Sequence, residues 1–361
     1  MNQILKKQYS PIGLEISHDA IRMIQVRKDN GSWALHRAAE EHYELDKDEA
    51  EDGSKKKAAI IKNMVKDFSF SGRQVVTTLS NRDVDILPVR LTSAEENGLE
   101  DKIIENARAR LPYKVEQAVI DYLPIESFKK PGEGEKSFWI IASHRSLVEQ
   151  HLSVIKEAGL HTKALDIQPC ALMRSLVTSG YAADGNHLLV HMGDRDSLFL
   201  FVGKEGLLGQ RMYLKGYQDM ADKLTEGLKI ERAEAFRLLS HYGFIGRRPD
   251  QEKKGAHNPD STTRAVHEII LPSFKEKFEG IKNFVNYCHA EIGEIRIEKI
   301  VLSGKACLIR NLDHMIEHGS EIKTEVLNPF TTLDVKKDKL AHIDPMHGSV
   351  FTVPLGLTLR E

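Results

Sequence analysis

The middle of the chain carries two apolar runs separated by a short polar turn, HLLVHMGDRDSLFLFVG (187–203). Short apolar runs on either side of a turn predict a strand hairpin, with the turn at 193–197. In the stretch that follows, Met220, Leu224 and Leu228 recur on one helical face. The pattern therefore predicts three consecutive strands and a helix, at 187–192, 198–202, 210–214 and 219–228.

The N-terminal part shows the same order of elements. Apolar residues alternate through IGLEISHDAIRMIQV (12–26) around a polar break, a third strand begins at Trp33, and a helical pattern covers 58–68. Glu15 and His191 fall at matching places, 176 residues apart. We therefore expect a duplicated unit of three meandering strands followed by a helix. Chance similarity is the weaker alternative, because strand meanders are common.

A segment of different character lies between these halves. Ser93 and Glu96 fit a capping box that opens a helix running toward Arg110. The order helix, strand, strand, helix, strand then predicts a small α+β domain inserted into the first half. Its later elements are expected at 118–125, 137–142, 146–158 and 163–167.

The remainder of the chain is expected to be mainly helical. The polar stretch 247–264 predicts an exposed loop. Apolar residues recur every three to four positions from Ile270 to Ile292, which predicts a long buried helix, bent at Pro272. The other predicted elements are a helix at 231–242, a strand at 298–302 and a helix that starts at Gly304.

Composition narrows the class of protein. With 361 residues the chain exceeds the usual size of one core, so we expect two lobes or more. The net charge of -2 gives no general attraction to nucleic acid or anionic lipid. No run approaches the roughly 18 apolar residues of a membrane span, which predicts a cytoplasmic location. The 3 cysteines, Cys170, Cys288 and Cys307, exclude a four-cysteine zinc site.

The candidate chemistry lies in two hairpin turns and one glycine turn. Backbone N–H groups in tight turns bind phosphate, because they are unpaired donors with a favourable dipole orientation. The turn at Gly304 is not a P-loop, since Ala306 stands where a hydroxyl residue would contact magnesium. No Rossmann glycine motif follows a strand either. The three turns are consistent with the parts of a nucleotide clamp.

Several stretches, taken in order, resemble one protein family. They are GLEISHDAIRMIQV (13–26), RARLPYKVEQAVIDYLPI (108–125), IIASHRSLVEQHLSVIKEAGLHTKALDIQPCALMRSL (140–176), HMGDRDS (191–197), RAEAFRLL (232–239), IVLSGKACLIRNL (300–312), EVLNPFTTL (325–333) and VPLGLTLRE (353–361). In their order and spacing they resemble the type IV pilus assembly protein PilM family, relatives of the cell-division protein FtsA. The resemblance extends over nearly the whole chain.

The resemblance implies an α/β, actin-like ATPase fold. This fold consists of two duplicated, ribonuclease H-like lobes with an inserted α+β subdomain. The first lobe would comprise 11–90 and 168–183, the inserted subdomain 91–167, the second lobe 186–215 and 297–361, and the helical subdomain of the second lobe 216–296.

The resemblance also implies a ligand. ATP with magnesium would lie between the lobes, with its phosphates at the hairpin turns and its base near the Gly304 loop. It assigns no catalytic residue and leaves the metal ligands open. The cofactor-binding residues implied are Glu15, Ser17, His18, Gly193, Asp194, Ser197, Glu234, Arg237, Gly304 and Lys305.

The implied partner is a membrane protein rather than nucleic acid. It is the cytoplasmic N-terminal peptide of an inner-membrane pilus assembly protein, PilN-like, bound in a groove of the first lobe. Through that partner the chain would be held at the inner membrane. Self-association is left open.

Several positions depart from the family's pattern. Ser17 stands where the first hairpin usually has glycine, and His191 replaces an aspartate whose oxygens suit magnesium better than imidazole does. Asp194 and Asp196 add negative charge near the expected phosphate, and unit charges about 4 Å apart repel by roughly 1 kcal/mol in water. Lys305 replaces a second glycine. Its side chain would block the adenosine pocket or reach a phosphate, and we expect it to block the pocket.

These departures predict a degenerate site without efficient ATP hydrolysis. We therefore expect a scaffold of a type IV pilus or related type II secretion machine, with an active ATPase that regulates assembly as the alternative. A sugar kinase of the same fold would need an acidic base beside a sugar pocket, and none is identified. Simpler interpretations stay open: His191 as a hydrogen-bonded strand residue, Glu15 as a solvated carboxylate, Glu234 and Arg237 as a surface ion pair, and Lys55, Lys56 and Lys57 as the solvated side of a helix or a contact with anionic membrane.

Overall fold

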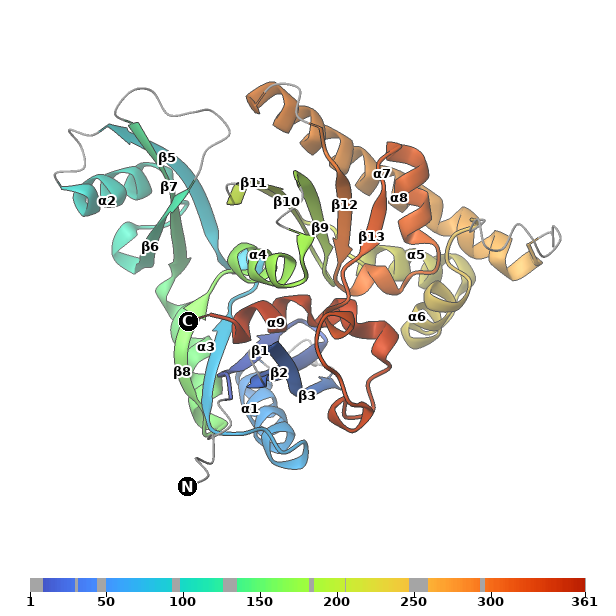
Figure 1. The fold of residues 1–361 in the computed structure, drawn as a ribbon, viewed down its shortest axis with the longest axis horizontal. Helices are drawn as coiled ribbons and strands as arrows, with labels where there is room; N and C mark the ends of the chain where they lie inside the picture. Colours follow the sequence, from blue (N-terminus) through green and yellow to red (C-terminus); the bar gives the residue numbers. More distant parts are fainter. Residues whose placement is uncertain are drawn as a thin grey trace. The chain divides into compact units, whose positions relative to one another are not determined.

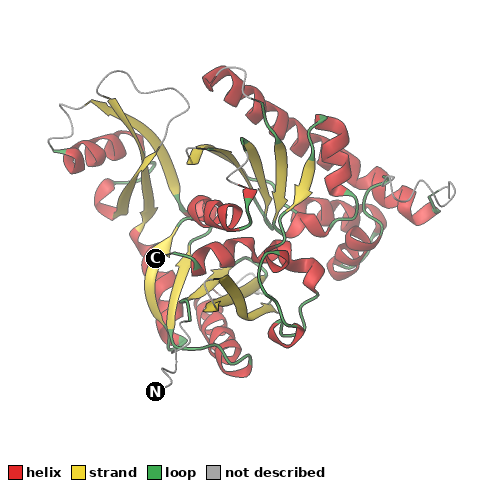
Figure 2. Ribbon diagram, in the orientation of Figure 1, coloured by secondary structure: helices red, strands yellow, loops and turns green. Residues whose placement is uncertain are grey.

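The structure, a computed structural model, describes residues 9–29, 32–43, 50–92, 98–125, 135–181, 185–204, 206–246, 259–292 and 296–360. The chain divides into two compact units, Met1–Ser179 with Asn328–Glu361 (unit 1) and Gly180–Leu327 (unit 2). Within the described residues, each unit contains a five-stranded sheet (Figures 1 and 2).

The sheet of unit 1 has the strand order β3-β2-β1-β4-β8. Its first three strands form an antiparallel meander, and β4 and β8 then pair in parallel with β1 and β4. Parallel strands need a crossover connection, which α1 supplies between β3 and β4. The elements are β1 (Ile12–Ile16), β2 (Ala20–Asp29), β3 (Ser32–His42), α1 (Ala50–Asp67), β4 (Gln74–Thr78), α3 (Arg145–Glu157) and β8 (His161–Asp166).

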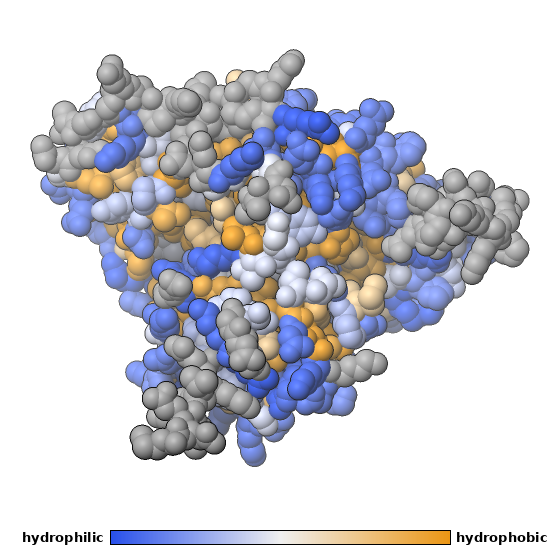
Figure 3. All heavy atoms as spheres, in the orientation of Figure 1, coloured by the Kyte–Doolittle hydropathy of each residue, from blue (hydrophilic) through white to orange (hydrophobic). Residues whose placement is uncertain are grey.

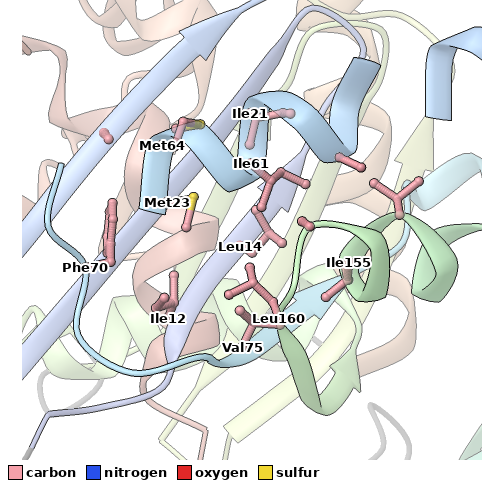
Figure 4. Close-up of a cluster of buried hydrophobic side chains, with 14 of the residues drawn as sticks. Ile12, Leu14, Ile21, Met23, Ile61, Met64, Phe70, Val75, Ile155 and Leu160 are labelled. Atoms are coloured by element: carbon pink, nitrogen blue, oxygen red, sulfur yellow. The ribbon is translucent and has the colours of Figure 1, made fainter. Parts of the chain in front are cut away.

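One face of this sheet forms a hydrophobic core against α1 and α3. Side chains alternate along a strand, so Ile12 and Leu14 of β1 point to the same face, as Figure 4 shows. Burial of side chains of this size contributes about 1.5–3 kcal/mol each. The other residues labelled in Figure 4 are Ile21, Met23, Ile61, Met64, Phe70, Val75, Ile155 and Leu160.

The opposite face carries α4 (Gln168–Thr178) and α9 (Thr352–Thr358). All residues of α9 are buried, as expected for a helix that is apolar on every side. A Cβ at Gly13 would lie 2.0 Å from the carbonyl oxygen of Pro354, and one at Gly356 would lie 1.7 Å from that of Ala171. Both contacts therefore require glycine.

This packing corrects the predicted extent of the second lobe. We expected 297–361 to belong to that lobe, but Asn328–Glu361 belongs to unit 1. The reason is that the apolar surface of α9 is buried against α4 and β1. The predicted segment 168–183 of the first lobe is also too long, because the first of the two segments of unit 1 ends at Ser179.

A second sheet of unit 1 contains β5 (Asp85–Thr92), β6 (Ala118–Ile125) and β7 (Glu135–His144) in the order β5-β7-β6, with α2 (Leu99–Arg110) packed on one face. The predicted boundaries 91–167 are wrong on both sides. β5 joins this sheet, whereas α3 packs on α1 and β8 pairs with β4. The capping box at Ser93 lies outside the described residues.

The sheet of unit 2 repeats the topology of unit 1, with the order β11-β10-β9-β12-β13. The first three strands are again an antiparallel meander, and the last two are again parallel. The predicted duplication is therefore confirmed. The elements are β9 (His187–Met192), β10 (Ser197–Gly203), β11 (Gly206–Tyr213), α5 (Gln218–Leu228), α6 (Arg232–His241), α7 (Ser261–Ile292), β12 (Lys299–Ser303), α8 (Leu312–Ser320) and β13 (Thr324–Val326).

Two predictions for unit 2 need correction. α7 begins at Ser261 and continues through Pro272, so the end of the predicted loop 247–264 is helical, while 247–258 lies outside the described residues. Gly304 opens a 3-10 turn instead of an α-helix, and α8 begins only after Asn311, whose positive φ of 63° interrupts the helix. Among the described helices, none combines the length and apolar character that a membrane crossing requires.

Candidate functional site

The turn between β1 and β2 holds the predicted residues of unit 1. Glu15 is buried at 7% exposure, and Ser17 and His18 form the turn that follows its strand, with His18 exposed. The Ser17 hydroxyl and the Ser17 N–H both donate to the Ala20 carbonyl, each at 2.9 Å. The serine in the family's glycine position therefore closes the turn itself.

A buried arginine that the sequence analysis did not single out dominates this hairpin. Arg22 lies directly across from Glu15, and its Nη1 is 3.7 Å from Glu15 Oε2, while its Nε donates to Glu40 Oε1 at 2.7 Å. Burial alone would lower the pKa of Arg22, but the carboxylates of Glu40, Glu15 and Asp19 outweigh it and the pKa is raised. Glu15 therefore already faces a cation that the chain supplies.

In unit 2, His191 occupies the position that corresponds to Glu15. Each is the residue before the last of its strand, β9 and β1 respectively. His191 is 5% exposed, and its Nδ1 is 2.9 Å from Ser303 Oγ at the end of β12. The imidazole thus serves a hydrogen bond between neighbouring parallel strands, as the simpler interpretation predicted.

The turn between β9 and β10 docks on the start of α5. The Tyr217 N–H donates to the Gly193 carbonyl and the Gln218 N–H to the Asp194 carbonyl, both at 2.9 Å. A Cβ at Gly216 would lie 2.4 Å from the Asp194 carbonyl oxygen, so the close approach requires glycine there. Amides at a helix start are the donors that bind phosphate, but here the turn itself accepts from them.

The side chain of Lys305 reaches this turn from the end of β12. Its Nζ is 3.4 Å from Asp194 Oδ1, and the two side chains are 10% and 7% exposed. The same Nζ lies 4.6 Å from the ring centre of Phe236 and 5.4 Å from that of Tyr217. These rings stack with centres 5.2 Å apart. Lys305 is therefore held in an ammonium cage, which we define as Asp194, Tyr217 and Phe236.

The other predicted residues of unit 2 lie apart from this cage or support it. Gly304 has a φ of +88°, and a Cβ there would lie 2.5 Å from the Met192 carbonyl oxygen. Ser197 Oγ donates to the Lys215 carbonyl at 2.7 Å. The half-exposed Glu234 and the exposed Arg237 bond to each other at 2.5 and 2.7 Å, which lowers the pKa of Glu234.

Both hairpins thus have a buried carboxylate matched by an internal cation. Magnesium prefers near-octahedral oxygen ligands, and carboxylates engaged by ammonium or guanidinium groups are poorly placed to provide them. These residues fit a magnesium–nucleotide complex poorly. Separately, no group of three or more His, Cys, Asp or Glu that could hold a metal ion occurs within the described ranges.

Some of the important residues left a signal in the sequence and some did not. Arg22 is a charged residue between the apolar Ile21 and Met23, and pairing across the turn places it opposite Glu15. Tyr217 and Phe236 gave no such signal, because nothing local connects them with Lys305.

Comparison with known sequences and structures completes the description. The family described as type IV pilus assembly protein PilM matches residues 13–202 and 227–361. A solved PilM-PilN type IV pilus biogenesis complex is similar at 20% identity, with a TM-score of 0.77 over 97% of this chain and 98% of that chain.

Two further solved structures share the fold. The ethanolamine utilization protein EutJ from Carboxydothermus hydrogenoformans has 13% identity and a TM-score of 0.55 over 99% of this chain and 91% of its own. MreB5 of Spiroplasma citri bound to ADP has 10% identity and a TM-score of 0.50 over 96% and 94%. These similarities confirm the α/β, actin-like ATPase fold.

Proposed function

The chain belongs to the type IV pilus assembly protein PilM family, and on that premise we propose that it is a scaffold of a type IV pilus or related type II secretion machine. In this role it binds the cytoplasmic N-terminal peptide of a PilN-like inner-membrane protein and is held at the membrane through it. The similarity to a PilM-PilN complex over 97% of the chain supports the choice of partner.

The observation that carries the scaffold role is that a cation of the chain itself faces a buried carboxylate at each hairpin. Arg22 faces Glu15 at 3.7 Å, and Lys305 faces Asp194 at 3.4 Å. A bound magnesium ion or phosphate group would have to compete with these contacts, each of which is intramolecular. We infer that the chain keeps one conformation without nucleotide and does not hydrolyse ATP efficiently.

Thermal melting tests this inference directly. A ligand present at 100 times its Kd stabilises the folded state by about 2.7 kcal/mol, which raises the melting temperature by several degrees. We expect no shift with ATP and magnesium, singly or together. A reproducible rise that disappears when magnesium is chelated would contradict the proposal.

Peptide binding tests the partner. Fluorescently labelled peptides of about 10 residues, taken from the N-terminal tails of candidate inner-membrane partners, are titrated with the full chain. We expect saturable binding by one tail, no binding by its scrambled version, and the same affinity with and without ATP. Absence of binding by every tail would remove the partner from the proposal.

A second candidate is a nucleotide-dependent ATPase that regulates assembly. Both units retain the hairpin and the same strand order, and the similar MreB5 structure is of a protein bound to ADP. Phosphate release above a blank without protein, abolished in a Lys305→Glu variant, would favour this candidate over the scaffold.

A further inference from the structure

Helix α1 carries three of its four exposed lysines on one side. Lys55, Lys62 and Lys66 are exposed, and successive residues turn by about 100° along a helix, so the three lie within about 40° of one another. They span roughly 16 Å along the helix axis. We call them the lysine stripe. The opposite side of α1 is buried in the core through Ala58, Ile61 and Met64.

The side chains of the lysine stripe are turned to solvent. None of these three side chains makes a hydrogen bond or an ion pair with a residue whose side chain the structure describes. Lys57 is the contrasting case in the same helix, because its ammonium lies 5.7 Å from the ring centre of Tyr43 and burial lowers its pKa. The stripe therefore concentrates positive charge at the surface of a chain whose net charge is only -2.

More positive charge lies beside the C-terminal end of α1. Arg37 Nε donates to the Phe68 carbonyl, just beyond the helix, at 3.0 Å. Burial, followed by the charges of Arg37, Lys339 and Arg27, lowers the pKa of His36 to about 4. Two acidic residues are described near this end: Asp338 is paired with Lys339 at 2.8 Å, and Asp67 is exposed at the helix end.

The chemistry of this surface favours one class of partner. Its charges are mainly lysine ammonium groups, and the exposed residues between them, Ala59 and Asn63, offer no aromatic ring on which a nucleic acid base could stack. Lysine clusters of this kind bind anionic lipid headgroups at about 1 kcal/mol per lysine. In Figure 3, hydrophilic residues lie at the lowest point of the picture, where Figure 1 draws α1.

We propose that the lysine stripe docks unit 1 on the anionic phospholipid headgroups of a membrane. This contact is additional to the peptide of the proposed function and does not depend on it. The contact of each lysine with a lipid headgroup is weak. A chain that is tethered to the membrane by the peptide would meet the lipid surface at high effective concentration.

Vesicle sedimentation with the full chain, in the absence of any partner peptide, tests the proposal. The vesicles contain either phosphatidylglycerol with phosphatidylethanolamine or phosphatidylcholine alone. We expect binding to the anionic vesicles only, strongly reduced by 0.5 M salt because headgroup attraction is screened. The variant K55Q/K62Q/K66Q should bind on the order of 100-fold more weakly, since each lysine contributes about fivefold.

A matched variant tests whether vesicle binding depends on the position of the lysines or only on the net charge of the chain. Lys204, Lys229 and Lys275 are exposed lysines of unit 2, so K204Q/K229Q/K275Q changes the net charge by the same amount. It should retain vesicle binding, and both variants should keep the wild-type melting temperature. Equal loss of vesicle binding in both variants would overturn the proposal, and so would binding to neutral vesicles. Binding of a mixed-sequence RNA in place of the vesicles would overturn it as well. Both variants should bind the partner peptide normally, which keeps this test distinct from that of the scaffold role.

Discussion

The hairpin of unit 1 and the hairpin of unit 2 occupy the same place in a duplicated topology, yet they balance their buried charge differently. In unit 1 the cation is Arg22, which stands across from Glu15 in the same hairpin. In unit 2 the corresponding strand position is His191, and the buried acid is Asp194 in the turn, matched by Lys305 from another strand end. The comparison shows that the fold preserves local charge balance and leaves the residues that achieve it free to differ.

The largest effect is expected from removing the cation of unit 1. Arg22→Met leaves the buried Glu15 and the half-buried Glu40 without their guanidinium, and breaking a buried pair in this way costs about 3–5 kcal/mol. Urea denaturation measures the loss. The triple variant R22M/E15Q/E40Q should recover most of it, because it removes the charges that the arginine balances. A loss below about 1 kcal/mol in Arg22→Met would mean that the cluster is not a buried pair in solution.

A smaller loss is expected in unit 2. Lys305→Met leaves Asp194 without its ammonium but keeps an apolar side chain against the rings of Tyr217 and Phe236, so we expect about 2–3 kcal/mol. The same denaturation experiment applies. In the double variant K305M/D194N the two effects should be clearly less than additive, since both residues belong to one interaction. Additive losses would show that the ammonium cage does not couple them.

Acid should act on unit 1 through a buried histidine. Thr77 Oγ1 lies 2.9 Å from His151 Nε2, and burial, with Lys57 second, lowers the pKa of His151 to about 4. As the pH falls, His151 is protonated in the unfolded chain before it is protonated in the folded chain. Its contribution to the free energy of unfolding is therefore intact above pH 6.5 and is lost between pH 6.5 and pH 4. The full loss is about 3 kcal/mol. His151→Gln should flatten the fall of unfolding free energy over this range.

The exposed His161 serves as the control for that measurement. His161→Gln should leave the pH dependence as it is in the wild type. If both variants show the same slope between pH 7 and pH 4, the titration responsible lies elsewhere in the chain.

The smallest effect is expected at the surface pair of α6. Glu234 and Arg237 bond at 2.5 and 2.7 Å, but their side chains are 40% and 62% exposed, and such pairs contribute little because water and salt screen them. E234Q/R237Q should melt within about 1 °C of the wild type. A clear destabilisation would give this pair a structural role that its exposure does not suggest.

Most of the elements could be predicted from the sequence, because the signals for them are local. Alternation around 17–19 located the first hairpin, and the recurrence from Ile270 to Ile292 located most of α7. The duplication was also visible, since the order of elements repeats. The boundaries of the inserted sheet were not, because β5 was not predicted and because the pairing of β8 with β4 joins segments that are far apart in the sequence.

The sequence by itself therefore determined many of the strands and helices, their repetition and the family to which the chain belongs, although β4, β5 and α9 were not predicted. Only the tertiary structure decided which charges meet and which sheet each segment joins. Lys305 and Asp194 are 111 residues apart, and α9 reaches β1 from the other end of the chain. Such contacts depend on strand pairing and on the close approach that glycines such as Gly13 and Gly356 allow, and neither leaves a periodic pattern along the chain.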